Sequence, residues 1–233
     1  MKRLVITALL ALGCSGPGSS RLSIPISAIG TPARPVTVSG FTVTLTVARV
    51  GFGPLTFCAS RAASPELCPN ALAEWAATAS IDALSPTPQP LGQVDGFTGT
   101  ARSVGFAYAI PWLATEKAPT PKSGAPGGHS AHLEGTATRV ADGRVVRFVA
   151  DLDVRPLVQA EPAVSQSGFT EELDPSVRRL DVRFDPTTWL AQIDFDQLAA
   201  SGTDVVVMPG SQANNALIVG MSDLGLPSFT WSK

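Results

Sequence analysis

The chain contains only two histidines, His129 and His132, and a carboxylate, Glu134, lies two residues beyond the second. If a strand begins just before His132, then His132 and Glu134 share one face, because side chains alternate along a strand. His129 follows Gly127 and Gly128, whose conformational freedom lets the backbone fold the imidazole back toward that face. Two neutral imidazoles and one carboxylate suit zinc or copper, so these three residues form a candidate metal site.

The same histidine spacing is also compatible with two surface side chains on a loop that bind nothing. A helical metalloprotease motif places two histidines one turn apart with a glutamate after the first, and this pattern is absent. A further ligand at a fixed spacing is also absent. Copper or zinc therefore remains one alternative and a site without any cofactor the other.

The sequence contains no complete catalytic set. A Gly-x-Ser-x-Gly motif is absent, and the glycine-rich segment 123–128 lacks the Gly-Lys-Ser/Thr ending of a phosphate-binding loop. The acid pairs Asp151 with Asp153 and Glu171 with Glu172 could serve glycoside hydrolysis if each spanned a cleft. Alternating charges on a strand more often form a solvated sheet face. We therefore expect a protein that is not an enzyme, with an envelope hydrolase as an alternative.

Composition indicates a folded chain of 233 residues with a substantial core. Hydrophobic residues make up 44% of the chain and charged residues 15%, so the sequence is not that of a disordered polyelectrolyte. The net charge of −2 without long charged runs argues against nucleic acid as a partner. The 21 glycines and 20 prolines are scattered between short β-branched runs, which is typical of many strands joined by turns.

Hydrophobic periodicity places several strands. Alternation predicts a half-buried strand over 41–47, and 104–110 alternates large apolar with small residues, so its small-residue face should be closely covered. The Asp142-Gly143 pair predicts a hairpin between 131–140 and 145–154. A short helix over 71–77 and a polar connection at 171–174 are further expectations.

Two helices are expected near the carboxyl end. Asp185 and Pro186 form an N-cap and first position, and Ser211 caps an apolar pattern over 212–222. The predicted fold is mainly β, an antiparallel β-sandwich with one or two short helices near the C-terminus. It forms a single domain over 22–233.

The long segment between residues 115 and 128 is rich in proline and glycine and has no periodicity. Loops of this length are uncommon unless they are functional or disordered. We therefore take it as a candidate binding loop, with Lys117, Lys122, Gly127 and Gly128 as its candidate contacts.

The amino terminus has the form of an export signal. Lys2 and Arg3 precede a mainly apolar run over 4–12 that is too short to span a bilayer. It closes with Ala11-Leu12-Gly13-Cys14, which resembles the lipobox of bacterial lipoproteins. The resemblance implies cleavage after residue 13, lipidation of Cys14, a flexible tether over 14–21, and anchoring in the cell envelope, in the outer membrane because Ser15 follows the cysteine.

The other two cysteines, Cys58 and Cys68, lie in an exported chain where disulfides persist. We predict that they pair. A thiolate metal site is the alternative, but the only potential ligand between them is Glu66.

The last hundred residues resemble exported copper-binding proteins paired with di-haem enzymes, the metallo-mystery pair family. The resemblance lies in His132-Leu133, Phe184-Asp185-Pro186, the segment 194–198 and Leu224-Gly225-Leu226. It implies His132 as a copper ligand, but the four-cysteine pattern of that family is absent.

The sequence as a whole predicts a lipid-anchored module that binds a ligand or a protein partner at the cell envelope. Its membrane contact is the lipid anchor. Copper or zinc handling is the alternative.

Overall fold

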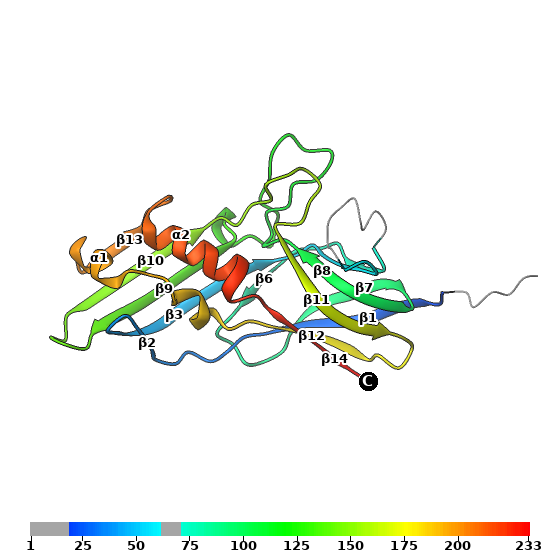
Figure 1. Cartoon of the computed structure of the whole chain (residues 1–233), viewed down its shortest axis with the longest axis horizontal. Coiled ribbons are helices and arrows are strands. Elements are labelled where there is room, and N and C mark those ends of the chain that lie inside the picture. Colours follow the sequence, from blue (N-terminus) through cyan, green and yellow to red (C-terminus); the bar gives the residue numbers. More distant parts are fainter. Residues whose placement is uncertain (1–18, 62–70) are drawn as a thin grey trace, which may run out of the picture.

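The computed structural model describes residues 19–61 and 71–233, which form a mainly β fold of two sheets. The larger sheet has the strand order β11 (Val164–Leu173), β8 (Gly99–Phe106), β4 (Leu55–Cys58), β5 (Ala73–Trp75), β7 (Gln89–Phe97), β1 (Arg21–Ile29), β12 (Arg179–Arg183) and β14 (Ser228–Ser232). The smaller sheet has the order β13 (Asp204–Val207), β10 (Val145–Leu152), β9 (Ala131–Arg139), β3 (Phe41–Phe52) and β2 (Val36–Val38), and β6 (Ala79–Asp82) pairs with β3. Figure 1 shows both sheets in one view.

Both sheets are mixed, so the expectation of a purely antiparallel fold is wrong. Strand β1 runs parallel to β12 in the larger sheet, and β10 runs parallel to β13 in the smaller one. Parallel neighbours need long crossover connections, whereas turn signals in a sequence identify only hairpins between consecutive strands. The predicted hairpin is confirmed, because β9 and β10 pair antiparallel from Thr138 opposite Val145 to Ala131 opposite Leu152.

Strand β3 follows its predicted alternation only as far as Leu45. Phe41, Val43 and Leu45 are buried, but a bulge between Leu45 and Val47 shifts the register against β9. The extra residue turns Val47 outward to a half-exposed position and brings Ala48 onto the buried face. The strand therefore stays in the core to Phe52.

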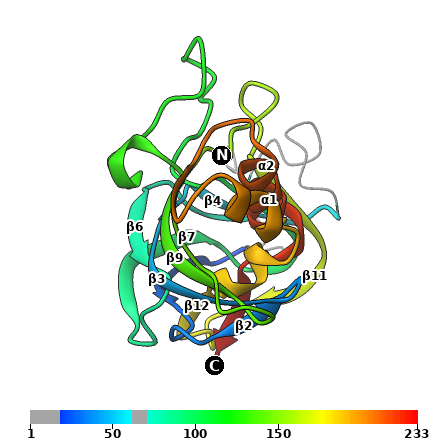
Figure 2. The same ribbon diagram turned by 90° about the vertical axis from the view of Figure 1, so that its left-hand side faces the viewer.

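One continuous core joins the two sheets. The ring of Phe52 in the smaller sheet lies 6.0 Å from Trp75 and 5.5 Å from Phe106 in the larger sheet, between ring centroids. The larger sheet also curls, because Trp231 on its edge strand β14 lies 5.0 Å from Phe57 on β4. Figure 2 shows the sheets curving around this shared interior.

The helices α1 and α2 lie over the smaller sheet (Figure 1), and five helical segments occur in the described part of the chain. They are η1 (Pro126–Gly128), η2 (Pro186–Leu190), α1 (Phe195–Ala200), α2 (Gln212–Val219) and η3 (Gly220–Leu224). Phe195 of α1 packs 5.7 Å from Phe41 and 6.0 Å from Phe148. Both predicted caps are confirmed, since Asp185 accepts from the Thr187 amide and Ser211 from the Asn214 amide. In the described part of the chain, no helix has the length and apolarity needed to cross a membrane.

Two local expectations are wrong. The segment expected as a helix over 71–77 contains strand β5, because Trp75 and Ala73 alternate with Glu74 and pair with β4 and β7. Glu171 and Glu172 lie in strand β11 rather than in a connection. In both cases pairing with neighbouring strands overrides a weak local preference.

The amino-terminal predictions lie largely outside the described residues. The signal, the lipobox and Cys14 belong to residues 1–18, and Cys68 also lies outside the described part. Cys58 is buried at the end of β4. Its pairing with Cys68 therefore stays a prediction. Of the tether predicted over 14–21, only residues 19–21 are described, and Arg21 is the first residue of β1.

Candidate functional site

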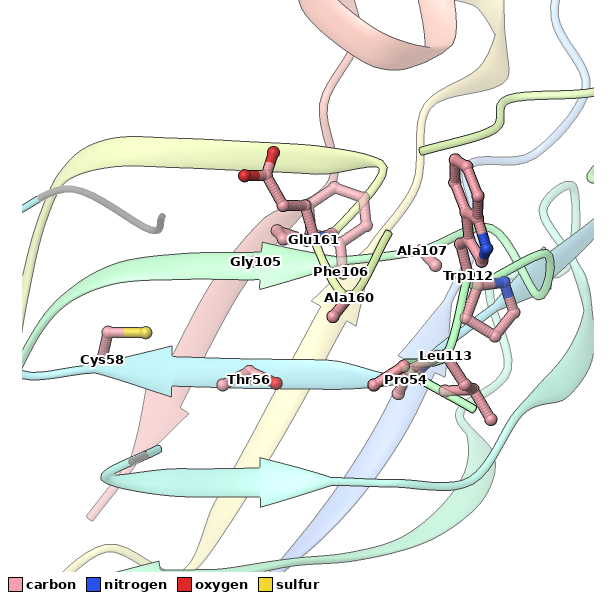
Figure 3. Close-up of a pocket in the computed structure, with 13 residues that line it drawn as sticks. Pro54, Thr56, Cys58, Gly105, Phe106, Ala107, Trp112, Leu113, Ala160 and Glu161 are labelled. Carbon is pink, nitrogen blue, oxygen red and sulfur yellow. The ribbon is translucent and has the colours of Figure 1, made fainter. Parts of the chain in front are cut away.

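A cavity of about 280 Å³ lies on the outer face of the larger sheet, where two loops approach strands β4 and β8 (Figure 3). Its lining residues are mostly apolar: Pro54, Thr56, Cys58, Gly105, Phe106, Ala107, Pro111, Trp112, Leu113, Ala114, Ala160, Glu161 and Pro162. The volume equals that of roughly nine water molecules at about 30 Å³ each. It is just below the usual range of small-molecule sites, which starts at about 300 Å³.

The floor of the cavity is built by strand alternation. Leu55 and Phe57 of β4 point into the core, so Thr56 between them faces outward beneath the loops. Gly105 of β8 lies directly opposite Thr56 and adds no side chain. Ser103, Ala107 and Ala109 are buried, as predicted for the small-residue face, although β8 ends at Phe106 rather than at residue 110. The absence of bulk at Gly105 leaves the space that the loops enclose.

The walls are two loops, 107–130 between β8 and β9 and 153–163 between β10 and β11. Hydrogen bonds connect these wall loops to each other. The side-chain amide of Gln159 donates to the carbonyl oxygens of Ala114 at 3.0 Å and of Glu116 at 2.7 Å. The indole N–H of Trp112 donates to the same Glu116 carbonyl at 3.1 Å. The Ala160 amide donates to the Trp112 carbonyl at 2.8 Å. These bonds fix the two loops relative to each other and so define the shape of the cavity.

The rim of the cavity carries exposed apolar side chains. Leu113, which lines the cavity, is 43% exposed. In the loop that contributes Ala160 and Glu161, Leu157 is 95% exposed and Val158 51%, and neither lines the cavity. Large apolar side chains grouped at the mouth of a cavity are typical of a surface that contacts another molecule.

The predicted binding loop does not line the cavity itself. Lys117 is exposed, and Lys122 forms an ion pair with Glu116, which lowers the pKa of that carboxyl. Gly127 and Gly128 have φ of +60° and +88°, so they shape the turn into β9, and ligand contact at these two glycines stays a prediction. Only the residues just before the predicted loop, Leu113 and Ala114 among them, reach the cavity.

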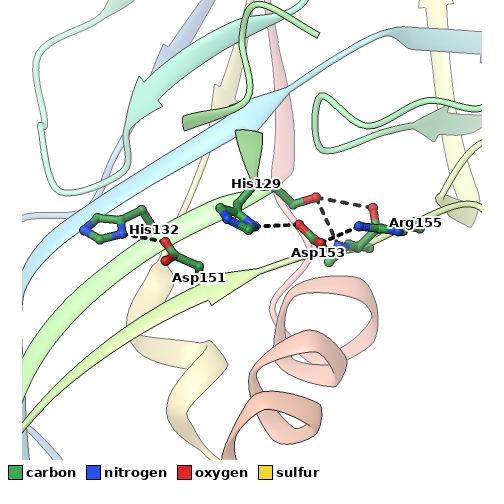
Figure 4. Close-up of polar contacts among 7 residues, drawn as sticks. His129, His132, Asp151, Asp153 and Arg155 are labelled. Carbon is green, nitrogen blue, oxygen red and sulfur yellow. Dashed lines mark hydrogen bonds and ion pairs between the residues drawn. The ribbon is translucent and has the colours of Figure 1, made fainter. Parts of the chain in front are cut away.

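The two histidines form separate pairs with carboxylates (Figure 4). His129 Nδ1 lies 3.0 Å from Asp153 Oδ1. His132 Nδ1 lies 2.7 Å from Asp151 Oδ1, and its Nε2 lies 3.2 Å from Glu134 Oε1. The hydrogen bond with Asp151 is the main cause that raises the pKa of His132.

This arrangement does not bring the three predicted ligands to one point. His129 pairs with Asp153, whereas His132 pairs with Asp151 and Glu134, so His129 makes no contact with the other two predicted ligands. Among residues 19–61 and 71–233, no group of three or more histidine, cysteine, aspartate or glutamate side chains has the geometry to hold a metal. Metal binding at His129, His132 and Glu134 stays a prediction.

The acid pairs considered for hydrolysis lie outside the cavity. Asp151 bonds to a histidine, and Asp153 also accepts from Arg155 at 2.7 Å. Glu172 accepts from the hydroxyl of Thr100 at 2.7 Å. Asp151 and Asp153 therefore take part in ion pairs with neighbouring basic side chains. This agrees with the expectation that these charges form a solvated sheet face and not a hydrolase site.

Sequence reasoning did not single out Trp112 or the segment 160–162. A signal was present, because Pro111-Trp112-Leu113 is a short apolar run directly before a long polar loop. The sequence does not indicate that a second loop, which is distant along the chain, packs against this apolar run through Gln159.

Comparison with protein-family models, curated proteins and solved structures gives no match to this chain.

Proposed function

We propose that the protein is a lipid-anchored binding module of the bacterial cell envelope, not an enzyme, and that it binds a small ligand in the cavity beside Trp112. The anchor and the outer-membrane location follow from the lipobox resemblance at Cys14. We interpret the two sheets around their common core as a sandwich-like scaffold. An envelope protein that delivers or receives the ligand is the natural partner of such a module.

The observation that carries this proposal is a preformed, mainly apolar cavity whose walls are fixed by hydrogen bonds from Gln159. A site that is organised before binding loses little conformational entropy when a ligand enters. Small-ligand sites are typically apolar clefts with a few polar groups that orient the ligand, and Thr56 and Glu161 are the polar side chains available here.

The test uses a neutral probe and a variant that fills the cavity. In the wild-type protein, 2-phenylethanol should shift the amide resonances of Leu113, Ala114 and Ala160 in a saturable manner. Thr56→Phe places a ring on the cavity floor and should abolish these shifts. Thr138→Phe is the matched control, because Thr138 is also half-exposed on a strand but lies in the smaller sheet. It should leave the shifts unchanged.

Two outcomes would contradict the proposal. One is the absence of saturable shifts at the cavity with any small probe. The other is an equal response in the wild type and in a folded Thr56→Phe protein, which would place the binding elsewhere. Metal handling through His129 and His132 remains the alternative prediction, and no contact described above favours it.

A further inference from the structure

We propose that the cavity selects small organic cations, namely molecules with a compact apolar body and a single ammonium group. This inference rests on the proposed function, because it names the class of ligand that the same cavity takes. It is carried by the carboxylates of Glu161 and Glu74, and by the absence of a basic side chain among the described residues that line the cavity.

The first observation is an uncompensated carboxylate. Of the described residues that line the cavity, Glu161 alone carries a charge, and its carboxylate makes no hydrogen bond or ion pair with any other described residue. A carboxylate beside an apolar surface attracts a cation more strongly than one in open water, because the local dielectric constant is lower. An ammonium group would provide the missing partner.

The second observation is a further negative charge beside the floor. Glu74 on β5 lies directly opposite Thr56 on β4, and its side chain is exposed. Directly opposite residues of antiparallel strands have Cβ atoms about 5 Å apart on the same face. Glu74 and Asp95 line a neighbouring surface hollow together with one cation, Arg21, so two carboxylates leave a net negative charge beside the cavity floor. This charge disfavours carboxylate or phosphate ligands.

The basic residues of the wall loops do not offset these charges. Lys122 is paired with Glu116, and Arg155 is paired with Asp153 at 2.7 Å. Lys117, the third basic residue of these two loops, is exposed, and none of the three cations lines the cavity. Glu161 therefore determines the charge preference at the cavity.

The apolar body of the ligand is expected on the side of Trp112. Glu161 and Trp112 lie on opposite sides of the cavity (Figure 3). Because the indole N–H already donates to the Glu116 carbonyl, the ring offers its carbon surface to a ligand. Leu113 and Pro111 extend this surface. The cavity volume of about 280 Å³ has room for roughly ten non-hydrogen atoms, which is the size of a small aromatic amine.

The experiment compares three probes of matched size and different charge: 2-phenylethylammonium, 2-phenylethanol and phenylacetate. Dissociation constants are measured from the saturable amide shifts at the cavity at one low ionic strength. We expect the ammonium compound to bind about fivefold more tightly than the alcohol, as for a half-exposed ion pair of about 1 kcal/mol. Phenylacetate should bind about fivefold more weakly than the alcohol.

Glu161→Gln isolates the carboxylate. It should bring the dissociation constant of the ammonium compound to that of the alcohol and leave the alcohol itself unchanged. Glu172→Gln removes a carboxylate on β11 outside the cavity lining and should preserve the fivefold preference.

Equal binding of the cation and the alcohol to the wild-type protein, or a preference that survives Glu161→Gln, would overturn the inference. In either case shifts with 2-phenylethanol would still support the proposed function. If none of the three probes shifts the cavity amides, the proposed function fails as well.

Discussion

His132 belongs to a row of charged side chains that crosses three strands of the smaller sheet. It lies opposite Arg49 on β3 and opposite Asp151 on β10, with Glu134 two residues along its own strand. The hydrogen bonds and charges of Asp151 and Glu134 favour the imidazolium form and outweigh the effect of partial burial, so the pKa of His132 is raised above 6.5. Its charge therefore affects folding stability in the neutral pH range.

The first prediction concerns the pH dependence of this contribution. Because the folded-state pKa is raised, the stabilisation by His132 is complete below about pH 6.5 and is lost as the pH rises through the folded value. The free energy of unfolding in urea should therefore differ more between the wild type and His132→Gln at about pH 6 than at about pH 8. His129→Gln, which alters the neighbouring pair with Asp153, serves as the control. A His132→Gln effect independent of pH would contradict the prediction.

At the level of residues, the sequence identifies which groups can do chemistry but not their partners. Glu134 is a predictable neighbour of His132, because strand alternation alone places both on one face. The Asp151 contact depends on the register of the hairpin, and the contact of Gln159 with the Trp112 loop depends on tertiary packing. The sequence therefore could not predict the cavity, although it shows the short apolar run that contains Trp112.

At the level of elements, sequence signals correctly predict turns and helix caps, because the hydrogen-bond partners there are close neighbours in the chain. The hairpin at Asp142-Gly143 and the cap at Ser211 are confirmed, since a turn or cap requires only adjacent residues. Strands β1 and β7 were not predicted. Their exposed faces carry proline, glycine and glutamine, and they are ordered by pairing with each other from Arg21 opposite Phe97.

The second prediction tests the cap of α2. Ser211 Oγ accepts from the Asn214 amide at 3.2 Å, and α2 packs Ala213 and Leu217 into the core. Ser211→Ala should lower the free energy of unfolding by about 1 kcal/mol, because an amide at the helix start loses its acceptor. Ser211→Asp should retain most of the stability. Ser123→Ala, at an exposed loop position, should have no effect on urea denaturation. Equal stability of Ser211→Ala and wild type would show that the cap is unimportant.

At the level of the whole molecule, the carboxyl-terminal strand joins parts of the chain that are distant in sequence. Trp231 of β14 packs on Phe57 of β4, and Phe229 lies 6.2 Å from Phe106 of β8. Phe106 in turn contacts Phe52 of the smaller sheet. This chain of aromatic contacts links the open edge of the curled sheet to the second sheet, so we expect both sheets to unfold as one unit.

The third prediction tests this coupling with Trp231→Ala. Removing a partly buried indole should cost about 2 kcal/mol, less than the roughly 3–5 kcal/mol of a fully buried ring. If the sheets are coupled, amide hydrogen exchange should accelerate equally at Leu180 in β12 and at Leu133 in β9. Trp231→Phe should cost little, because the buried indole N–H has no hydrogen-bond partner among the described residues and its loss leaves no acceptor unpaired. Faster exchange at Leu180 with unchanged exchange at Leu133 would instead show that the smaller sheet is stable on its own.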